Sequence, residues 1–105
     1  MIDLYPFRLQ HLKPGVVALH GELDAHSARF AAQDLTDVVD GGDDLEVQTH
    51  GVTFIDSAGL ELLEQVVAHV AATGGAVRFP AASGTVRRIV GLTGCTTIDV
   101  CTTDA

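Results

Sequence analysis

The sequence is poor in positive charge and has no long apolar run. Six Lys and Arg residues stand against 14 Asp and Glu residues, which gives a formal net charge of -8. The average field of such a domain repels the phosphate backbone of a nucleic acid. The negative charge mainly indicates a solvated acidic surface, and it also favours docking on a basic face of another protein. No segment approaches the roughly 18 to 20 apolar residues that cross a bilayer, and residues 1–6 lack the basic and apolar regions of a signal peptide. We therefore expect a cytoplasmic protein that does not insert into membranes.

Cysteine is scarce, and the histidines lack metal-binding spacing. Cys95 and Cys101 are the only cysteines, and two thiols make neither a disulfide framework nor a four-ligand metal site. We expect both thiols to be reduced, with a redox pair as the alternative. The five histidines show no H-x-x-x-H spacing. The sequence thus predicts no metal and no cofactor of its own.

The length and the turn residues point to one domain that opens with a hairpin. With 105 residues, 47% of them apolar, the chain can build one continuous core, and we expect a single domain over residues 1–105. Two apolar-rich runs, Phe7–Leu12 and Val16–His20, flank the segment Lys13-Pro14-Gly15. Proline presets one turn position and glycine tolerates positive φ at the next, so this pattern predicts a β-hairpin.

Apolar spacing predicts a helix, a strand and a second helix after the hairpin. The first helix should run from about Ser27 to Val39 and stop at Gly41-Gly42. A strand, interrupted or bulged at Gly51, should then lead up to Asp56. The second helix has the clearest pattern, with apolar residues on one face at Leu63, Val66, Val67 and Val70 and a stop at Gly74-Gly75.

The remaining pattern completes an α/β arrangement. A short strand from Ala76 to Phe79 should precede a third helical stripe at Val86, Ile89 and Val90, and Thr97–Cys101 fits a final strand. The expected order is ββαβαβαβ. Strands that alternate with helices imply crossover connections, so we expect a mixed, largely parallel β-sheet with flanking helices and an antiparallel edge from the hairpin.

The segment Val52–Leu60 contains the residues that are best placed to react or to be modified. Asp56 and Ser57 lie where a β-branched strand gives way to a helix, and the first turn of a helix offers unpaired N–H groups and the positive end of the dipole. A phosphate on Ser57 would be well accommodated there. Gly59 costs about 1 kcal/mol relative to alanine in a helix, which suggests that a backbone or a partner approaches closely at this position.

Two other roles are open for this junction. Asp56 or Ser57 can simply cap the helix, although the Glu or Gln of a capping box is missing, because Gly59 and Leu60 occupy its positions. A serine hydrolase also places its nucleophile at a strand-to-helix turn, but it needs a small residue where Ile55 stands. A hydrolase would show turnover that disappears in Ser57→Ala.

At this point the chain resembles the STAS domain (sulphate transporter and anti-sigma-factor antagonist), particularly its small stand-alone bacterial antagonists. Gly21-Glu22-Leu23-Asp24 matches the family's G-E-L-D before its first helix, and Val52–Leu60 matches its V-T-F-I-D-S-[SA]-G-L. The segment 91–94, Gly-Leu-Thr-Gly, falls where the family has a similar segment after its third helix. The resemblance covers nearly the whole chain and implies a mixed sheet flanked by helices.

The resemblance implies a phosphorylation cycle centred on Ser57, which matches the family's acceptor serine. An anti-sigma factor that is itself a serine kinase phosphorylates the antagonist, the unmodified antagonist binds the anti-sigma factor and frees the sigma factor, and a phosphatase resets the phosphorylated form. ATP and Mg²⁺ belong to the kinase, so the chain itself is not expected to be an enzyme. Ala58 replaces a second serine and removes only an alternative hydroxyl. The partner-binding residues expected from the resemblance are Asp24, Asp56, Ser57, Ala58 and Gly59.

The charges around Ser57 suggest how such a switch would work. A phosphate adds about -1.5 to -2 charges, and each charge repels a carboxylate roughly 5 Å away by about 3 kcal/mol at an effective dielectric near 20. A remaining penalty of about 2 to 3 kcal/mol would weaken a complex roughly 30- to 150-fold. If Asp24 and Asp56 converge on Ser57, phosphorylation should change the interface while the fold persists.

The sequence departs from the family at Gln48-Thr49-His50, where close relatives commonly have an Asp-Leu-Ser-like stretch. This departure bears on the partner more than on the fold. His50 is interpreted as an ordinary surface or strand-end residue, with a proton sensor as the alternative if it meets Asp56. The alternative function is a STAS subunit that serves a lipid-transport or other membrane complex without any phosphorylation.

Overall fold

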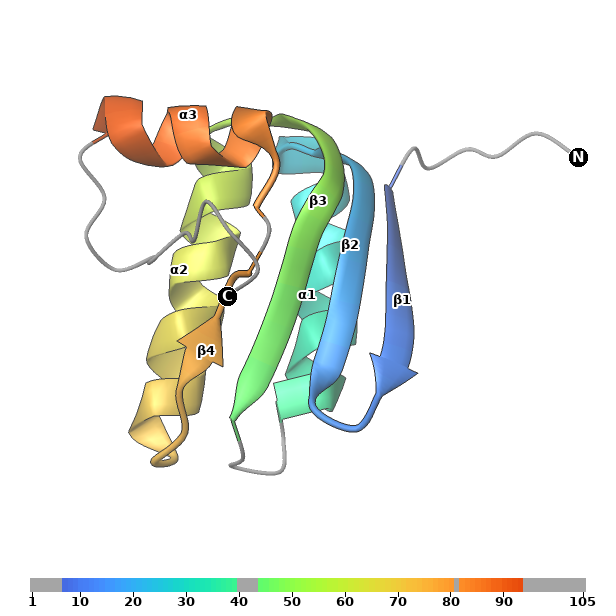
Figure 1. Ribbon diagram of the computed structural model, residues 1–105, viewed down its shortest axis with the longest axis vertical. Coiled ribbons are helices and arrows are strands. Elements are labelled where there is room, and N and C mark those ends of the chain that lie inside the picture. The colour runs from blue at the N-terminus through green and yellow to red at the C-terminus, as the bar shows by residue number, and fades with distance from the viewer. Residues whose placement is uncertain (1–6, 40–43, 81, 94–105) are drawn as a thin grey trace, which may run out of the picture.

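The computed structural model describes residues 7–39, 44–80 and 82–93, which form a sheet with helices behind one face (Figure 1). Its strands follow the order β1-β2-β3-β4 in space; β1 pairs with β2 in antiparallel fashion, and the other two pairs are parallel. The mixed, largely parallel sheet with flanking helices is therefore confirmed. The elements are β1 (Phe7–Lys13), β2 (Val16–Leu23), α1 (Ala25–Val39), β3 (Leu45–Ile55), α2 (Ser57–Ala72), β4 (Val77–Arg78) and α3 (Gly84–Thr93).

The opening hairpin forms as the sequence predicts. Gly15 has a φ of 80°, a left-handed conformation that glycine adopts at little cost, and it turns β1 back onto β2. Both strands are longer than predicted, because β1 continues to Lys13 and β2 continues through Gly21 to Leu23. The additional residues of β2 pair with the second half of β3, so they carry the sheet up to the edge where α1 and α2 begin.

Irregular pairing between β2 and β3 confirms the predicted bulge. Ala18 pairs with Gln48, and His20 pairs with Gly51. Two steps along β2 therefore match three steps along β3, so β3 contains one extra residue in this stretch. A Cβ atom on Gly51 would collide with the imidazole ring of His20, which explains why glycine stands there. The register shifts a second time between Gly21 and Glu22.

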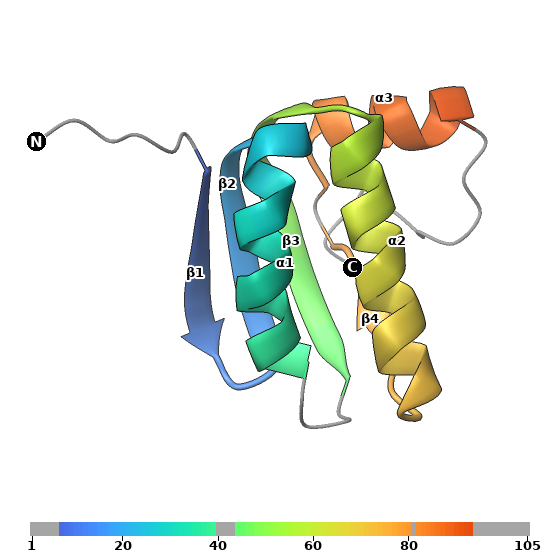
Figure 2. The same ribbon diagram turned by 180° about the vertical axis from the view of Figure 1, so that it is seen from behind.

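The core lies between the sheet and two helices on the same face. Figure 2 shows α1 and α2 side by side in front of the sheet, and α3 lies across the end of the sheet at which α2 begins. The predicted stripe of α2 is buried at three of its four positions, Val67 being only half-buried, and Leu60 and Leu62 join it. On α3, Val86 and Val90 are buried and Ile89 packs against the core.

Several predicted boundaries change in the structure. The first helix begins at Ala25 and not near Ser27, because Asp24 caps it, and the predicted strand Ala76–Phe79 is shortened to Val77–Arg78. Residues 91–93 form the last turn of α3, whereas the matching family segment was expected to follow that helix. The predicted strand Thr97–Cys101 and the Cys95 thiol lie outside the described residues.

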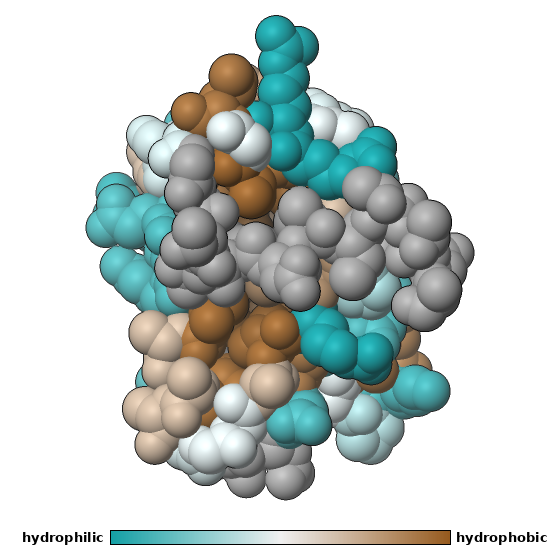
Figure 3. Space-filling model, turned by 60° about the vertical axis from the view of Figure 1, so that its left-hand side comes forward, coloured by the Kyte–Doolittle hydropathy of each residue, from teal (hydrophilic) through white to brown (hydrophobic). Residues whose placement is uncertain are grey.

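The outer surface mixes apolar and polar side chains. Figure 3 brings the side with α2, α3 and β4 forward and shows apolar surface at the end of the molecule occupied by α3, next to hydrophilic side chains. Leu92 on α3 is 77% exposed. In the part of the chain that the structure describes, no helix combines the length and the apolar character required to cross a membrane.

Candidate functional site

The ends of β2 and β3 bring the two acidic residues of the predicted site to one edge of the sheet. Leu23 pairs with Ile55 in the parallel register, and the backbone N–H of Asp56 donates a hydrogen bond of 3.4 Å to the carbonyl oxygen of Leu23. Asp24 and Asp56 are the next residues of the two strands, and α1 and α2 start directly after them (Figure 1). Two helix N-termini and two carboxylates therefore meet at the same edge.

Asp24 caps α1 through a reciprocal pair of hydrogen bonds. Its Oδ1 accepts from the backbone N–H of Ser27 at 2.9 Å and from that of His26 at 3.0 Å, while the Ser27 Oγ accepts from the Asp24 N–H at 3.0 Å. Ser27 is only 2% exposed, and its hydroxyl also donates to the Glu22 carbonyl at 2.7 Å. The arrangement is a capping box in which serine takes the place of Glu or Gln.

This capping changes the acidity of Asp24. The hydrogen bond from the Ser27 backbone N–H lowers the pKa of Asp24 below its ordinary value of 3.8, since that bond favours the charged carboxylate. The Ser27 hydroxyl and the N–H and charge of His26 act in the same direction, whereas partial desolvation opposes them. Asp24 is therefore ionised at neutral pH, and its charge is directed toward the first turn of α1.

Asp56 caps α2, which confirms the interpretation of this residue as a helix cap. Its backbone is extended, with φ of -115° and ψ of -171°, and its Oδ1 accepts from the Gly59 N–H at 3.0 Å. Gly59 occupies the third helical position and has no side chain with which to reciprocate, so the capping box is absent, as the sequence predicts.

Ser57 is the first residue of α2, and its side chain is exposed. Within the described residues its hydroxyl makes no hydrogen bond, since the cap of α2 is supplied by the neighbouring carboxylate of Asp56. A macromolecule can reach this hydroxyl without unfolding the helix. Capping and the proposed modification thus fall on two different residues, Asp56 and Ser57.

Gly59 allows α2 to start against the end of β2. A Cβ atom at this position would overlap the carbonyl oxygen of Leu23 and lie 2.9 Å from Cγ1 of Ile55. The close approach predicted from the sequence is therefore confirmed, and the approaching group is backbone. Ala58 is half-buried beside it.

The structure gathers the five predicted site residues at one edge, and both carboxylates there have a capping role. Asp24 is engaged by α1 and Asp56 by α2, so each carboxylate already satisfies the first turn of its own helix. Sequence reasoning missed Ser27, which fixes the orientation of Asp24. Its signal is the spacing, three residues after the cap.

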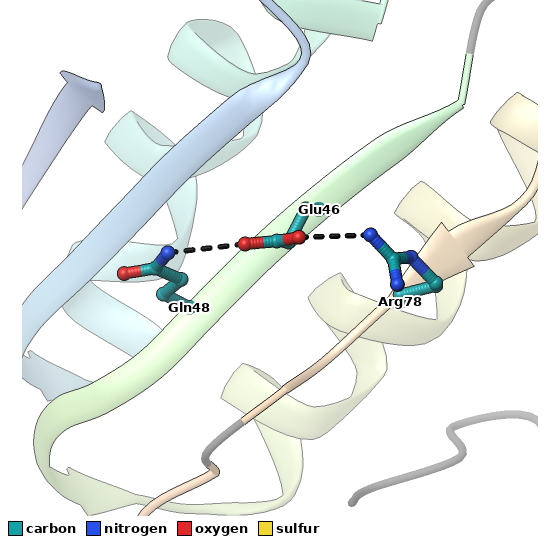
Figure 4. Close-up of polar contacts among 3 residues, drawn as sticks. All are labelled: Glu46, Gln48 and Arg78. Atoms are coloured by element: carbon teal, nitrogen blue, oxygen red, sulfur yellow. Dashed lines mark hydrogen bonds and ion pairs between the residues drawn. The ribbon is translucent and has the colours of Figure 1, made fainter. Parts of the chain in front are cut away.

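The segment 48–50 lies along β3 and away from the capped edge. Figure 4 shows Glu46 accepting hydrogen bonds from Gln48 at 3.0 Å and from Arg78 of β4 at 2.9 Å. The His50 ring stands edge-on to the His20 ring, with centroids 6.2 Å apart, so its aromatic neighbour is a histidine of β2. Across the described ranges, no group of three or more His, Cys, Asp or Glu residues could hold a metal ion.

Comparisons with known proteins agree with this architecture. A family model described as STAS domain matches residues 8–103. The anti-sigma factor antagonist SpoIIAA in its unphosphorylated form is 20% identical, with a TM-score of 0.69 over 90% of this chain and 87% of that chain. The phosphorylated form of SpoIIAA, described as a Bacillus cell fate determinant, is also 20% identical, with a TM-score of 0.65 over 90% of each chain.

A third structure is slightly more similar in sequence. An anti-sigma factor antagonist from Mycobacterium paratuberculosis is 25% identical, with a TM-score of 0.72 over 90% of this chain and 82% of that chain. A search of curated protein sequences found no match. The solved structures thus agree with the described fold at low sequence identity.

Proposed function

Because the chain belongs to the STAS domain family, we propose that it is a cytoplasmic anti-sigma factor antagonist whose binding is switched off by phosphorylation of Ser57. In this proposal the chain is a binding protein and not a catalyst. Its unmodified form binds an anti-sigma factor with serine kinase activity, and a phosphatase restores that form. The observation that carries the proposal is the exposed Ser57 hydroxyl, which takes no part in capping α2.

Phosphoryl transfer would take place in the active site of the partner. The Ser57 Oγ attacks the γ-phosphorus of ATP, the bond between that phosphorus and the β–γ bridging oxygen breaks, and ADP leaves. The hydroxyl proton passes to a base of the kinase or to water. The chain contributes an accessible hydroxyl on a rigid helix end, and ATP and Mg²⁺ are bound by the kinase.

The capped helix end explains how the added charge would act on binding. A phosphate on Ser57 would lie beside the carboxylate of Asp56, which already occupies the Gly59 N–H at 3.0 Å. Two anions then share one helix terminus. The positive end of the helix dipole offsets part of their repulsion, but the phosphate still adds about -2 charges to the surface. An anti-sigma factor surface that accommodates the neutral hydroxyl would lose affinity, while the buried core of the chain is unaffected.

The test uses the purified chain and purified anti-sigma factors with kinase activity from the same organism. Incubation with ATP and Mg²⁺, followed by mass spectrometry, should place one phosphate on Ser57 in the wild type and none in Ser57→Ala. The unmodified chain should be retained by the immobilised kinase, and the phosphorylated chain should be released. If none of these kinases binds or modifies the chain, and it instead co-purifies with a membrane transport complex, the proposal is wrong and the alternative of an unphosphorylated subunit takes its place.

A further inference from the structure

A β-bulge turns Phe54 toward solvent three residues before Ser57. Gly21 pairs with Val52, but the next residue, Glu22, pairs with Phe54, so Thr53 is an extra residue in β3. Side chains on a regular strand alternate between its faces, which would place Phe54 on the same face as the buried Val52. The extra residue reverses the alternation.

The exposure of individual residues shows this reversal. Val52 and Ile55 are 2% and 6% exposed, so both face the core although they are three positions apart. Thr53 and Phe54, between them, are both exposed. The bulge therefore buries an isoleucine that regular pairing would expose, and it exposes a phenylalanine that regular pairing would bury. Bulges commonly occur next to functional sites, where they change the direction of a side chain.

Single exposed apolar side chains are common on protein surfaces, so the exposure of Phe54 does not by itself indicate a binding site. Its position in the fold separates it from the other exposed apolar residues. Within the described residues, the exposed large apolar side chains are Leu12 (44%), Phe30 (46%), Phe54 (47%) and Leu92 (77%). Leu12 lies beside the hairpin turn, Phe30 contacts the His26 ring on α1, and Leu92 lies in the last turn of α3. Phe54 lies at the strand end that leads directly into Asp56 and Ser57.

Exposed carboxylates lie on the two elements that adjoin this end of β3. Glu22, its cross-strand partner on β2, is exposed, and so is Glu61, which lies one helical turn after Ser57 on the same side of α2. The formal net charge of -8 adds to this local field. An aromatic side chain with an acidic border fits a partner surface that has an apolar pocket bordered by Arg or Lys side chains.

We propose that Phe54 is the apolar anchor of the surface with which the chain binds its anti-sigma factor, and that the partner receives it in an apolar pocket with a basic border. This inference rests on the function proposed above and assigns the contact that holds the complex together. Ser57 lies at the margin of that contact. A phosphate there would bring negative charge to the border of the pocket, where it would have to be desolvated on binding.

The test compares two phenylalanines of nearly equal exposure. The anti-sigma factor that binds the unmodified wild type is immobilised, and the dissociation constants of Phe54→Ala and Phe30→Ala are measured. Phe54→Ala should weaken binding about tenfold or more, as expected for a central aromatic anchor, whereas Phe30→Ala should remain within about twofold of the wild type. The kinase should also show a higher KM for Phe54→Ala, with kcat unchanged, because docking is lost and the phosphoryl transfer geometry is not.

Two additional measurements separate anchoring from folding and test the charged border. Circular dichroism and thermal unfolding establish that Phe54→Ala is folded, and Phe54→Leu, which keeps an apolar group on the same bulge, should regain most of the affinity. Glu22→Gln and Glu61→Gln should each reduce the dependence of the affinity on salt concentration.

The outcomes distinguish this inference from the proposed function. If the wild type binds the anti-sigma factor and Phe54→Ala binds equally well, the anchor is wrong while the antagonist function stands. If the wild type binds no anti-sigma factor, both proposals are wrong. If Phe54→Ala instead abolishes self-association of the chain in sedimentation experiments and leaves partner binding unchanged, the surface receives a second copy, which also overturns the inference.

Discussion

The carbonyl oxygen of Leu23 lies so close to Gly59 that a Cβ atom at position 59 would overlap it. This contact joins the end of β2 to the first turn of α2, and it thereby fixes the helix end that carries Ser57. The contact is between backbone groups, which cannot adjust as a flexible side chain does.

The first prediction concerns this contact. Gly59→Ala should lower the free energy of unfolding by about 2 kcal/mol, because overpacking against backbone outweighs the gain of about 1 kcal/mol in helix propensity. Chemical denaturation measures the change. Gly91→Ala is the matched control, since Gly91 lies in α3 and a Cβ there would have nothing within 4 Å. The control should stabilise the protein by up to about 1 kcal/mol, and a stabilised Gly59→Ala would contradict the close approach.

A second prediction follows from the capping of α1 by Asp24. A carboxylate with a lowered pKa contributes stability above its unfolded-state pKa, and this contribution is lost as the pH falls through the folded-state value. Asp24→Ala should therefore be less stable than the wild type at pH 7, and the difference should begin to shrink near pH 4 and vanish only below the lowered folded-state pKa of Asp24. Thermal unfolding at a series of pH values measures it. Gly91→Ala, which removes no carboxylate, is the control, and its stability should change with pH as that of the wild type does.

The buried hydroxyl of Thr49 gives a third prediction. Thr49 is 0% exposed, and its Oγ1 has no hydrogen-bond partner among the described residues. Replacing the hydroxyl with a methyl group removes an unsatisfied polar group, so Thr49→Val should raise the free energy of unfolding by about 1 kcal/mol. Thr53→Val, at an exposed position of the same strand, should stay within about 0.5 kcal/mol of the wild type. A destabilised Thr49→Val would mean that the hydroxyl is satisfied in solution.

The proposed switch gives a fourth prediction. Ser57→Asp should weaken binding to the anti-sigma factor roughly 30-fold, the lower end of the range for a full phosphate, while Ser57→Ala should bind as the wild type does. Calorimetric titration measures both. Ser83→Asp is the charge-matched control, because the Ser83 Oγ accepts from the Val86 N–H at the start of α3, where Asp also caps well. Equal weakening by both aspartates would indicate a general charge effect and contradict a switch located at Ser57.

Much of the fold could be predicted because its signals are local. The Lys13-Pro14-Gly15 turn, the apolar stripe of α2 and the stop at Gly74 depend on neighbouring residues only. The same holds for Ser57, which the sequence places between a β-branched strand and a helix. The length of β4 could not be predicted, since its two residues are defined by pairing with Leu45 and Glu46 of a distant segment.

The details of the site were harder to predict because they depend on pairing between strands. The role of Asp24 as a cap follows from the extension of β2 to Leu23, which shifts the start of α1 to Ala25. The exposure of Phe54 depends on the second bulge, and the residues Val52–Ile55 alone do not show where the extra residue falls. Gly59 is the intermediate case: the sequence predicted a close approach there, but only the packing of α2 on β2 shows that Leu23 is the group involved.

The packing of the His20 ring against Gly51 also restricts the register between β2 and β3. The ring fills the space where a side chain at position 51 would be, and its Nε2 lies 3.0 Å from Oε1 of Gln10 on β1. The imidazole of His20 on β2 thus contacts both neighbouring strands, β1 and β3. A shift of β3 by one residue would move the side chain of His50 or Val52 onto the ring, so this contact opposes a change in the register that exposes Phe54.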